Sequence, residues 1–497
     1  MKKKSESRRV PASGSLEMEG IEPGANGRMR RPWRRRLLAV SFSALLSACA
    51  ANNGAPSASF GTWAWVSGGD TINRTGIYGT LGAAAPSNVP GGRHAAVSWR
   101  DAAGRFWLFG GEGYDSAGHY GYLNDLWRYD PATLEWTWVS GGNMINQAGV
   151  FGAEGTPNPS NIPGARHSAV SWQDAAGRLW LFGGDGCDSA GTVGHLNDLW
   201  RYDPAISEWT WVSGGNMVNP PGVYGAQGTA APSNVPGGRD SAVAWIDATG
   251  KLWLFGGGGY DSIGSYGYLN DLWRYDPAAS EWTWVSGGDV CGQKGIYGTQ
   301  GTAAASNVPG SRYGATGWLD SGGSLWLFGG FGFDYLDGAQ GYLNDTWKFD
   351  PVTLEWTWIG GSTDRGQNGV YGVPGAAAPS NVPGGRYGTT SGLDASGNFW
   401  LFGGFGMGAS GYDSYLNDLW KFDMTTLEWT WESGSNTINQ PGVYGTLGTA
   451  ASSNIPGTRD GAVCWIDADG NFWFFGGVGL DSADHAGFLN DLWRYTR

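Results

Sequence analysis

Residues 93–139 read RHAAVSWRDAAGRFWLFGGEGYDSAGHYGYLNDLWRYDPATLEWTWV, and this stretch decides the fold. It contains four short runs rich in aromatic and β-branched residues, at 93–99, 106–111, 123–131 and 135–139. Each run is bounded by Gly, Pro or Asp, a pattern typical of β-strands joined by tight turns. The stretch therefore predicts one antiparallel unit of four strands.

The same unit recurs along the chain. The intervals between successive Trp-x-Trp pairs are 73, 73, 73, 74 and 73 residues. The first Trp of each pair is Trp63, Trp136, Trp209, Trp282, Trp356 or Trp429. Four-stranded units at a fixed interval are the signature of propeller blades. We predict an all-β fold, a six-bladed β-propeller over residues 60–497.

The chain ends fit a closed ring. The Trp-x-Trp pair at Trp63 has no third strand before it, and the last third strand, 489–495, has no fourth strand after it. These two fragments complete one blade, so we expect the N-terminal strand to join the C-terminal blade and remove the exposed edges.

The order of features within a unit resembles the Kelch motif. A Gly pair closes the second strand, Asn-Asp opens the third, an aromatic residue precedes Asp-Pro, and a Trp lies in the fourth. The Gly pairs are Gly110-Gly111, Gly183-Gly184, Gly256-Gly257, Gly329-Gly330, Gly403-Gly404 and Gly476-Gly477. The resemblance covers residues 60–497 and implies a Kelch-type propeller, although Kelch repeats usually have about 50 residues. The excess lies in the loop between blades.

Loop lengths distinguish the two faces of such a propeller. In an antiparallel meander, the loops between strands 2 and 3 and between successive blades lie at the same end. Both are long here, as at 112–122 and 143–165, whereas the other connections are short. We therefore predict that ligand binding takes place on the long-loop face.

Two rings of side chains are predicted to lie on that face. An Arg opens every first strand, and six guanidiniums near the channel mouth would attract an anion or a carboxylate. An aromatic residue recurs in the interblade loop and would stack on sugars or peptide side chains. The alternatives are that each Arg pairs with a carboxylate such as Asp125, and that each aromatic residue anchors its loop. The two rings are Arg93, Arg166, Arg239, Arg312, Arg386 and Arg459, and Tyr78, Phe151, Tyr224, Tyr297, Tyr371 and Tyr444.

Few residues indicate a cofactor or a catalytic centre. Asp115 and its counterparts would suit calcium, but their spacing is more typical of turns. We predict no catalytic residue and no metal ligand; His94 and His167 occupy equivalent positions, which favours a structural role. Galactose oxidase shares the Kelch blade motif but needs a copper site outside the repeat, and no matching set stands out here. A disulfide between Cys187 and Cys291 is left open.

The first 48 residues form a predicted signal segment. They carry 11 basic and 4 acidic residues and end in a short apolar run. Leu46-Ser47-Ala48-Cys49 resembles the bacterial lipobox, so Cys49 is the predicted lipidation site and 49–59 a short tether. Ordinary secretory cleavage near Ala48 is the alternative, and translation starts at Met1 or Met29. We expect an exported, lipid-anchored protein of the bacterial cell envelope, at the outer membrane or the cell surface.

The net charge and the predicted architecture together limit the classes of partner and function. Residues 49–497 carry 20 basic and 40 acidic residues, a net charge of −20, which argues against a nucleic-acid partner. We expect a monomeric, non-catalytic binding protein that engages a carbohydrate or a protein through the long-loop face and the membrane only through its lipid. The alternative is an epimerase, mutarotase or lyase acting on acidic sugars at the channel mouth, similar to sialic acid mutarotase. A purely structural envelope role is the third reading.

Overall fold

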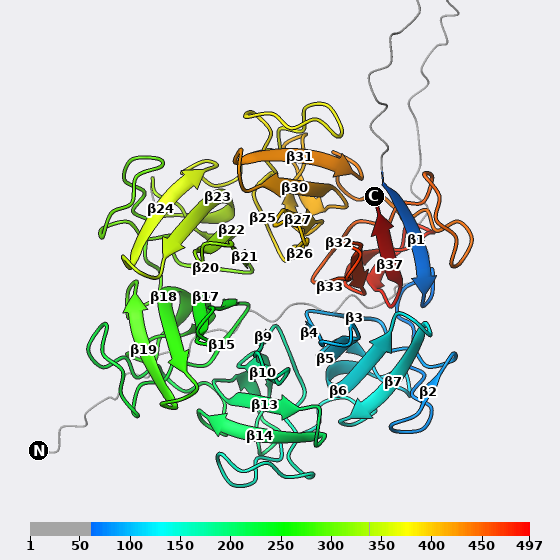
Figure 1. Cartoon of the computed structure of the whole chain (residues 1–497), viewed down its shortest axis with the longest axis horizontal. Helices are drawn as coiled ribbons and strands as arrows, with labels where there is room; N and C mark the ends of the chain where they lie inside the picture. The colour runs from blue at the N-terminus through cyan, green and yellow to red at the C-terminus, as the bar shows by residue number, and fades with distance from the viewer. Residues whose placement is uncertain (1–60, 337) are drawn as a thin grey trace, which may run out of the picture. The chain divides into compact units, whose positions relative to one another are not determined.

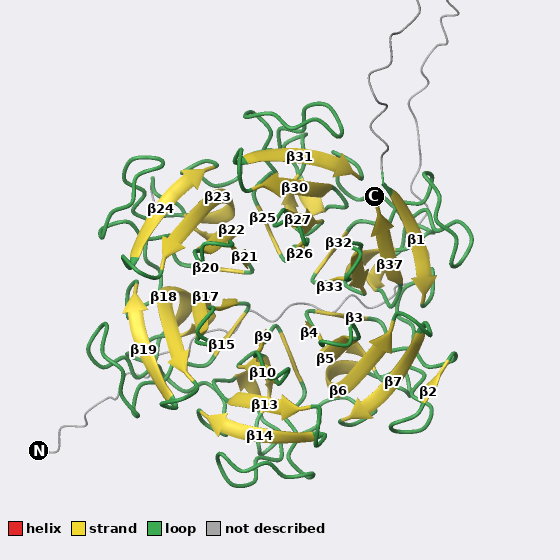
Figure 2. Cartoon of the chain, in the orientation of Figure 1, coloured by secondary structure: helices red, strands yellow, loops and turns green. Residues whose placement is uncertain are grey.

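The computed structural model describes residues 61–336 and 338–497. These residues form 37 β-strands and no helix, so this part of the chain contains no helix that could cross a membrane (Figure 2). The prediction of an all-β fold is confirmed. The predicted leader, the lipidation site Cys49 and the whole tether, 49–59, lie outside the described residues.

The strands fall into six groups along the chain. The first group contains β2 (Ala84–Ala85), β3 (Arg93–His94), β4 (Val97–Arg100), β5 (Phe106–Tyr114), β6 (Tyr120–Asp130) and β7 (Glu135–Ser140). The second contains β8 (Arg166–His167), β9 (Val170–Gln173), β10 (Leu179–Phe182), β11 (Asp185–Cys187), β12 (Val193–His195), β13 (Leu199–Asp203) and β14 (Glu208–Ser213). The third contains β15 (Arg239–Asp240), β16 (Val243–Ile246), β17 (Leu252–Tyr260), β18 (Tyr266–Asp276) and β19 (Glu281–Ser286).

The other three groups follow the same order. The fourth contains β20 (Arg312–Tyr313), β21 (Thr316–Leu319), β22 (Leu325–Phe333), β23 (Gln340–Asp350) and β24 (Glu355–Gly360). The fifth contains β25 (Arg386–Tyr387), β26 (Thr390–Leu393), β27 (Phe399–Phe402), β28 (Phe405–Met407), β29 (Asp413–Tyr415), β30 (Leu419–Asp423) and β31 (Glu428–Ser433). The sixth contains β32 (Arg459–Asp460), β33 (Val463–Ile466), β34 (Phe472–Phe475), β35 (Val478–Leu480), β36 (Ala486–Phe488), β37 (Leu492–Thr496) and, from the start of the propeller, β1 (Thr62–Ser67).

Each group is an antiparallel meander that runs outward from a central axis, as in the order β9-β10-β13-β14. The innermost strands β4, β9, β16, β21, β26 and β33 contact one another in a closed cycle (Figure 1). The strand β1 pairs with β37, with Thr62 opposite Thr496. The N-terminal strand therefore supplies the outer strand of the sheet that contains the C-terminus.

The hydrophobic core lies between neighbouring blades. One cluster joins Trp99 and Phe109 of the first blade to Leu181 and Trp200 of the second. Indole N–H groups add hydrogen bonds across the same interfaces; Trp99 donates to the carbonyl of Trp172 at 2.9 Å. Large buried aromatic side chains that also satisfy their polar atom contribute strongly to such interfaces. The abundance of Trp in the sequence is thus explained by interblade packing.

Every predicted Arg of the first ring lies in a buried ion pair. Each guanidinium binds both oxygens of the Asn-Asp carboxylate in its own blade at 2.6–2.8 Å. The side chains of both partners are at most 1% exposed. The pairs are Arg93–Asp125, Arg166–Asp198, Arg239–Asp271, Arg312–Asp345, Arg386–Asp418 and Arg459–Asp491.

The same carboxylates anchor the predicted aromatic ring. Five Tyr hydroxyls donate to the Asp at 2.6–2.7 Å, and the indole two residues after the Asp donates at 2.7 Å. Burial, followed by the charge of Asp125, raises the pKa of Tyr78 well above its usual value, so its hydroxyl remains a proton donor. The aromatic residues are Tyr78, Phe151, Tyr224, Tyr297, Tyr371 and Tyr444, each at most 7% exposed.

These contacts correct the prediction that the two rings bind a ligand. A guanidinium or phenol that is buried and fully engaged with a carboxylate offers no surface to an anion or a sugar. The alternative interpretation, in which Arg pairs with the Asn-Asp carboxylate and the aromatic residue anchors its loop, describes what the structure shows. Both rings serve the architecture of the blades.

The Gly pair after strand 2 is required because backbone carbonyl groups lie very close to both residues. Gly110 and Gly111 have φ angles of 66° and 97°, in the left-handed region. A Cβ on Gly110 would lie 2.7 Å from the carbonyl oxygen of Arg166, and one on Gly111 would lie 2.8 Å from that of His94. Only glycine combines this backbone conformation with this proximity.

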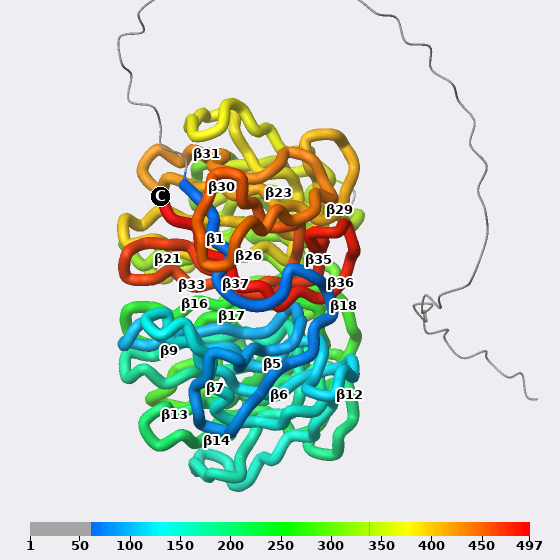
Figure 3. Tube along the Cα trace, turned by 90° about the vertical axis from the view of Figure 1, so that its right-hand side faces the viewer, coloured from blue at the N-terminus to red at the C-terminus, as the bar shows by residue number. Residues whose placement is uncertain are grey.

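The long interblade loops lie only in part on the long-loop face. Their first residues stay beside the strand 2–3 hairpin, where Asn146 accepts the Tyr122 N–H at 2.9 Å. The middle of the loop lies along the outer edge of the following blade, where Ala85 pairs with Trp136 and Asn88 donates to the Trp136 carbonyl at 3.0 Å. An outer strand would otherwise present unpaired backbone groups. The face is therefore formed mainly by the hairpin ends, seen beside β12, β29 and β36 at one side of Figure 3.

The buried ion pairs generate a first prediction about stability. Replacing Asp271 with Asn leaves the Arg239 charge buried without a counter-charge, and we expect the free energy of unfolding to fall by about 3–5 kcal/mol. Urea denaturation measures the change. The matched control is Asp276→Asn, which affects the partly exposed ion pair with Lys251 and is expected to cost about 1 kcal/mol or less. Equal effects in the two variants would contradict the central role of the buried pair.

The Phe at position 151 allows the hydrogen bond of the anchoring Tyr to be tested in both directions. In the second blade Phe151 occupies the place of the anchoring Tyr, so Asp198 lacks one hydrogen bond that the other five carboxylates accept. We expect Phe151→Tyr to raise the free energy of unfolding by about 1 kcal/mol and Tyr224→Phe to lower it by a similar amount. Thermal and urea denaturation of both variants check the signs, and a destabilised Phe151→Tyr would refute the shared geometry.

Candidate functional site

A ring of backbone hydrogen bonds surrounds the propeller axis. Ala95 donates its N–H to the Gly461 carbonyl at 2.7 Å, and the next five donors continue the circle back to Ala95, with distances of 2.7–3.0 Å. All six residues have φ between 51° and 65°. They are Ala95, Ser168, Ser241, Gly314, Gly388 and Gly461. Beside the ring, the axis contains a cavity of about 260 Å³ lined by small residues such as Ser98, Ser171 and Thr390.

The residues just before this ring form the candidate site. In each blade, the residue after the buried Arg is opposite one residue of strand 2, which is opposite one of strand 3. We call these three positions in all six blades the axial cluster. From the first blade to the sixth they are His94, Glu112 and Tyr122; His167, Asp185 and His195; Asp240, Gly258 and Tyr268; Tyr313, Phe331 and Tyr342; Tyr387, Phe405 and Tyr415; Asp460, Val478 and Phe488.

One arc of the axial cluster is rich in carboxylates and imidazoles. His167 Nε2 lies 3.5 Å from Asp185 Oδ2, and the Tyr122 hydroxyl donates to the same oxygen at 3.1 Å. His195 Nδ1 lies 3.5 Å from Asp240 Oδ1. The side chains of these His and Asp residues are 16–24% exposed, so they are reachable from solvent. This arc combines carboxylate hydrogen-bond acceptors with imidazole groups.

The two His residues nearest the first interface have opposite pKa shifts. Burial and the neighbouring His167 lower the pKa of His94 to about 4. Burial also opposes protonation of His167, but the hydrogen bond to Asp185 and the charges of Glu112 and Asp185 outweigh it and raise its pKa. His94 is therefore neutral at physiological pH, while His167 is the imidazole that the carboxylates favour in its protonated form.

The other arc of the axial cluster is aromatic. Tyr313 lies between Tyr268 and Tyr387, with ring centroids 4.9 and 5.4 Å away. Tyr342 stacks on Tyr387 at 6.1 Å, and Phe405 lies 5.8 Å from Tyr387. These side chains are partly exposed. Partly exposed Tyr rings combine an apolar face with a polar tip, which suits stacking against a sugar or a peptide side chain.

Asp460 completes the charged arc from the sixth blade. It is 8% exposed, and its Oδ1 atom has no hydrogen-bond partner. Burial raises the pKa of its carboxyl to about 7. A carboxyl with an unsatisfied buried oxygen is costly to retain for packing alone, and perturbed groups of this type are common at functional sites.

Most of the axial cluster was missed by reading the sequence. Its residues His94 and His167 were interpreted as structural. The sequence does mark this position. The residue after the Arg that opens each repeat differs between blades, as His, His, Asp, Tyr, Tyr and Asp, while the surrounding residues repeat. Variation at one position of an otherwise repeated unit would have identified the site.

The Asp residues considered for calcium close their own turns. Asp115 Oδ1 accepts the N–H groups of Ala117 and His119 at 2.8 and 2.9 Å, and its counterpart Asp188 accepts those of Ala190 and Thr192 at 2.8 Å. This is the turn chemistry that their spacing indicated. The cysteines Cys187, Cys291 and Cys464 are all free, so the disulfide left open between the first two is not formed.

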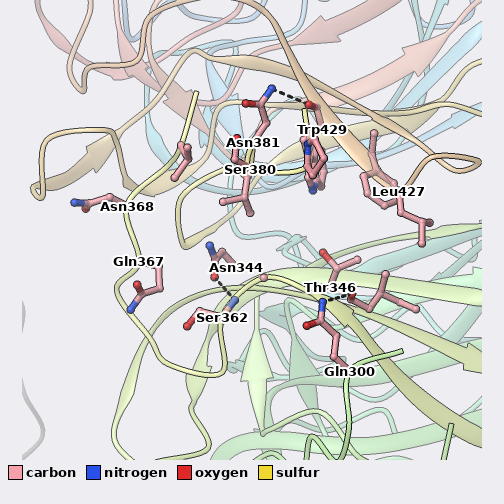
Figure 4. Close-up of a pocket in the computed structure, with 17 residues that line it drawn as sticks. Gln300, Asn344, Thr346, Ser362, Gln367, Asn368, Ser380, Asn381, Leu427 and Trp429 are labelled. Carbon is pink, nitrogen blue, oxygen red and sulfur yellow. Dashed lines mark hydrogen bonds between the residues drawn. The ribbon is translucent and has the colours of Figure 1, made fainter. Parts of the chain in front are cut away.

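Pockets also occur at the periphery. Figure 4 shows one of about 410 Å³ between the fourth and fifth blades, where Asn381 donates to the Trp429 carbonyl at 3.0 Å and Asn344 accepts from Ser362 at 3.1 Å. A second of about 430 Å³ is lined by equivalent residues between the sixth and first blades, such as Asn88 in place of Asn381. Because these polar groups are engaged in fixing the loops, the pockets follow from the repeat itself. The axial cluster remains the candidate site.

The raised pKa of Asp460 predicts a pH-dependent stability difference. The folded-state value lies above that of a free Asp, near 3.9, so ionisation of Asp460 costs stability. That cost grows as the pH rises from about 4 to 7 and is constant above. We expect the stability of Asp460→Asn relative to the parent protein to increase over this window, measured by urea denaturation at pH 4 to 8. The exposed-turn variant Asp469→Asn is the control, and a difference independent of pH would rule out the assigned ionisation.

Comparison with known families adds the final element. A family model described as the KLHDC2/KLHL20/DRC7 Kelch-repeats domain matches residues 82–286 and 155–360. The matched regions together span more than half of the chain and begin within the first blade. They agree with the Gly pairs, the Asn-Asp pairs and the four-stranded antiparallel sheets described above. The chain therefore belongs to the Kelch-repeat family of β-propeller proteins.

Proposed function

We propose that this protein is a non-catalytic binding protein of the bacterial cell envelope that engages a carbohydrate or a protein at the axial cluster. The observation that carries the proposal is the concentration of blade-specific side chains at this one place. Kelch propellers serve as binding scaffolds, and a scaffold of six near-identical units gains selectivity only where the units differ.

The chemistry of the axial cluster favours some ligands over others. Glu112, Asp185, Asp240 and Asp460 supply hydrogen-bond acceptors and negative charge, opposite the aromatic arc centred on Tyr387. Sugar hydroxyls and the basic or hydroxylated side chains of a protein can donate to these carboxylates while an apolar face stacks on the Tyr rings. The ligand is therefore expected to be neutral or basic.

The charges around the channel mouth do not fit an enzyme that acts on acidic sugars. It depended on six guanidiniums at the channel mouth, and all six are buried in ion pairs with their own carboxylates. The axial cluster instead presents carboxylates, which repel an acidic sugar. An enzyme of that class would need a different recognition element.

The cellular location of the protein is part of the same proposal. The lipobox-like sequence ending at Cys49 supports export and acylation, with the monomeric propeller linked to the outer membrane or cell surface by residues 49–59. Radiolabelled palmitate incorporation that is lost in Cys49→Ser would support this anchor. Secretion of an unlipidated chain would favour ordinary signal cleavage instead.

Binding can be tested with glycan and peptide arrays probed with the propeller. We expect signals for neutral glycans or basic peptides and a loss of about fivefold or more in Tyr387→Ala, because stacking on one aromatic ring is worth about 1 kcal/mol. Val352→Ser, on a 90% exposed residue of a short turn, is the matched control and should bind as the parent does.

Two array results would decide against the proposal. Silence across both glycans and peptides would remove the binding role, and equal binding by Tyr387→Ala and the parent would move the site away from the axial cluster. A parallel array in EGTA tests calcium, since loss of binding there would assign calcium a part in this face despite the turn geometry of Asp115.

A further inference from the structure

Three side chains of the axial cluster converge across the interface of the first two blades. The ligand atoms of His94, Glu112 and His167 all lie within 4.8 Å of one another. We propose that this triad binds a divalent transition-metal ion of the zinc class. The inference does not depend on the identity of the carbohydrate or protein ligand.

The fold fixes the positions of these three residues. His94 and Glu112 face each other in the β3–β5 ladder, and His167 occupies the position of His94 in the next blade, on β8. The backbone hydrogen bond from Ser168 to Ala95, at 2.7 Å, sets the spacing of the two blades immediately beside the imidazoles. The two imidazole centroids are 5.8 Å apart at an angle of 33°. The ligand set is therefore positioned by strands and not by a loop.

The distances are close to those that a metal requires. Two ligands at about 2.0–2.1 Å from a tetrahedral ion are about 3.3 Å apart. His94 Nδ1 and Glu112 Oε2 are 3.8 Å apart in the structure. Metal binding therefore requires rotation of these partly exposed side chains, whose ligand atoms now lie within 4.8 Å of one another.

One triad residue has a free ligand atom, and the other two are oriented by neighbouring groups. The Tyr120 hydroxyl donates to Glu112 Oε1 and leaves Oε2 facing His94. The Nδ1 atom of His94 has no hydrogen-bond partner. His167 has one ring nitrogen 3.0 Å from the Ser168 hydroxyl and the other 3.5 Å from Asp185, which itself accepts the Tyr122 hydroxyl. Metal binding would replace one of these His167 contacts and retain the other, in the manner by which outer carboxylates and hydroxyls orient metal-bound imidazoles.

The donor set selects the class of ion. Two imidazoles and one carboxylate suit zinc, cobalt and nickel, whereas calcium and magnesium prefer sets made only of oxygen. Three protein ligands leave a fourth tetrahedral position open. Because the side chains of His94 and Glu112 are each 21% exposed, that position can exchange with solvent or with an oxygen of a bound ligand.

The test uses the full chain without an affinity tag, stripped with a chelator and dialysed. Titration with Zn²⁺ by calorimetry is expected to give one equivalent per chain, and Co²⁺ is expected to give visible absorption bands that Zn²⁺ abolishes. Glu112→Gln and His94→Ala should each weaken binding by at least about tenfold, and Asp185→Asn by about tenfold. Melting temperatures without metal confirm that each variant is folded.

The matched control is His119→Ala. His119 is an exposed imidazole beside a carboxylate, 3.3 Å from Asp115, but it lies on a hairpin turn outside the axial cluster. It should bind both ions as the parent does. The proposal is overturned if the parent shows no saturable binding, if binding survives unchanged in the folded Glu112→Gln and His94→Ala variants, or if His119→Ala is the variant that loses it.

Discussion

The buried ion pair between Arg and the Asn-Asp carboxylate is the interaction on which the rest of the structure depends. Arg93 donates its backbone N–H to Leu489 at 3.0 Å and accepts from Gly477 at 2.8 Å, both in the sixth blade, while its guanidinium binds Asp125 in the first. One residue therefore fixes the backbone of one blade to the interior of the next. A buried charge pair is tolerated only with its hydrogen bonds satisfied. Beside the two guanidinium bonds, every carboxylate accepts an indole N–H, and all but Asp198 also accept a phenol O–H.

The same repetition that made the fold predictable concealed the site. Positions identical in all six units, such as the Gly pairs and the Asp of Asn-Asp, report what every blade needs, and they predicted strands, turns and architecture. The Arg ring is also constant and the aromatic ring nearly so, with Phe151 as the one exception, and both rings are structural. The axial cluster consists of positions that vary, and recognising it required the register of the short inner strands, which places His94, Glu112 and Tyr122 in one row. Burial and register are tertiary properties that periodicity alone does not supply.

The interblade loops show a second limit of sequence reasoning. Their length indicated an elaborated face, but backbone pairing decided where they lie. The outer strand of each blade has unpaired N–H and C=O groups, and the loop satisfies them, as at Ala85 and Trp136. The additional loop residues thus cover the outer strand of each blade. The long-loop face is then formed mainly by the hairpin ends and the axial cluster. The side chains that differ between blades are consequently concentrated near the axis, where the axial cluster brings residues of all six blades together.

The circle of backbone hydrogen bonds from Ala95 through Gly461 has a consequence for evolution by duplication. A linear array of repeats can gain or lose one unit at either end with little effect on the others. Here each donor finds its acceptor only in the adjacent blade, so an added or deleted unit breaks the circle unless every interblade angle changes together. The number of blades is therefore hard to change. New surface properties arise more readily by substitution of single side chains that project from the circle.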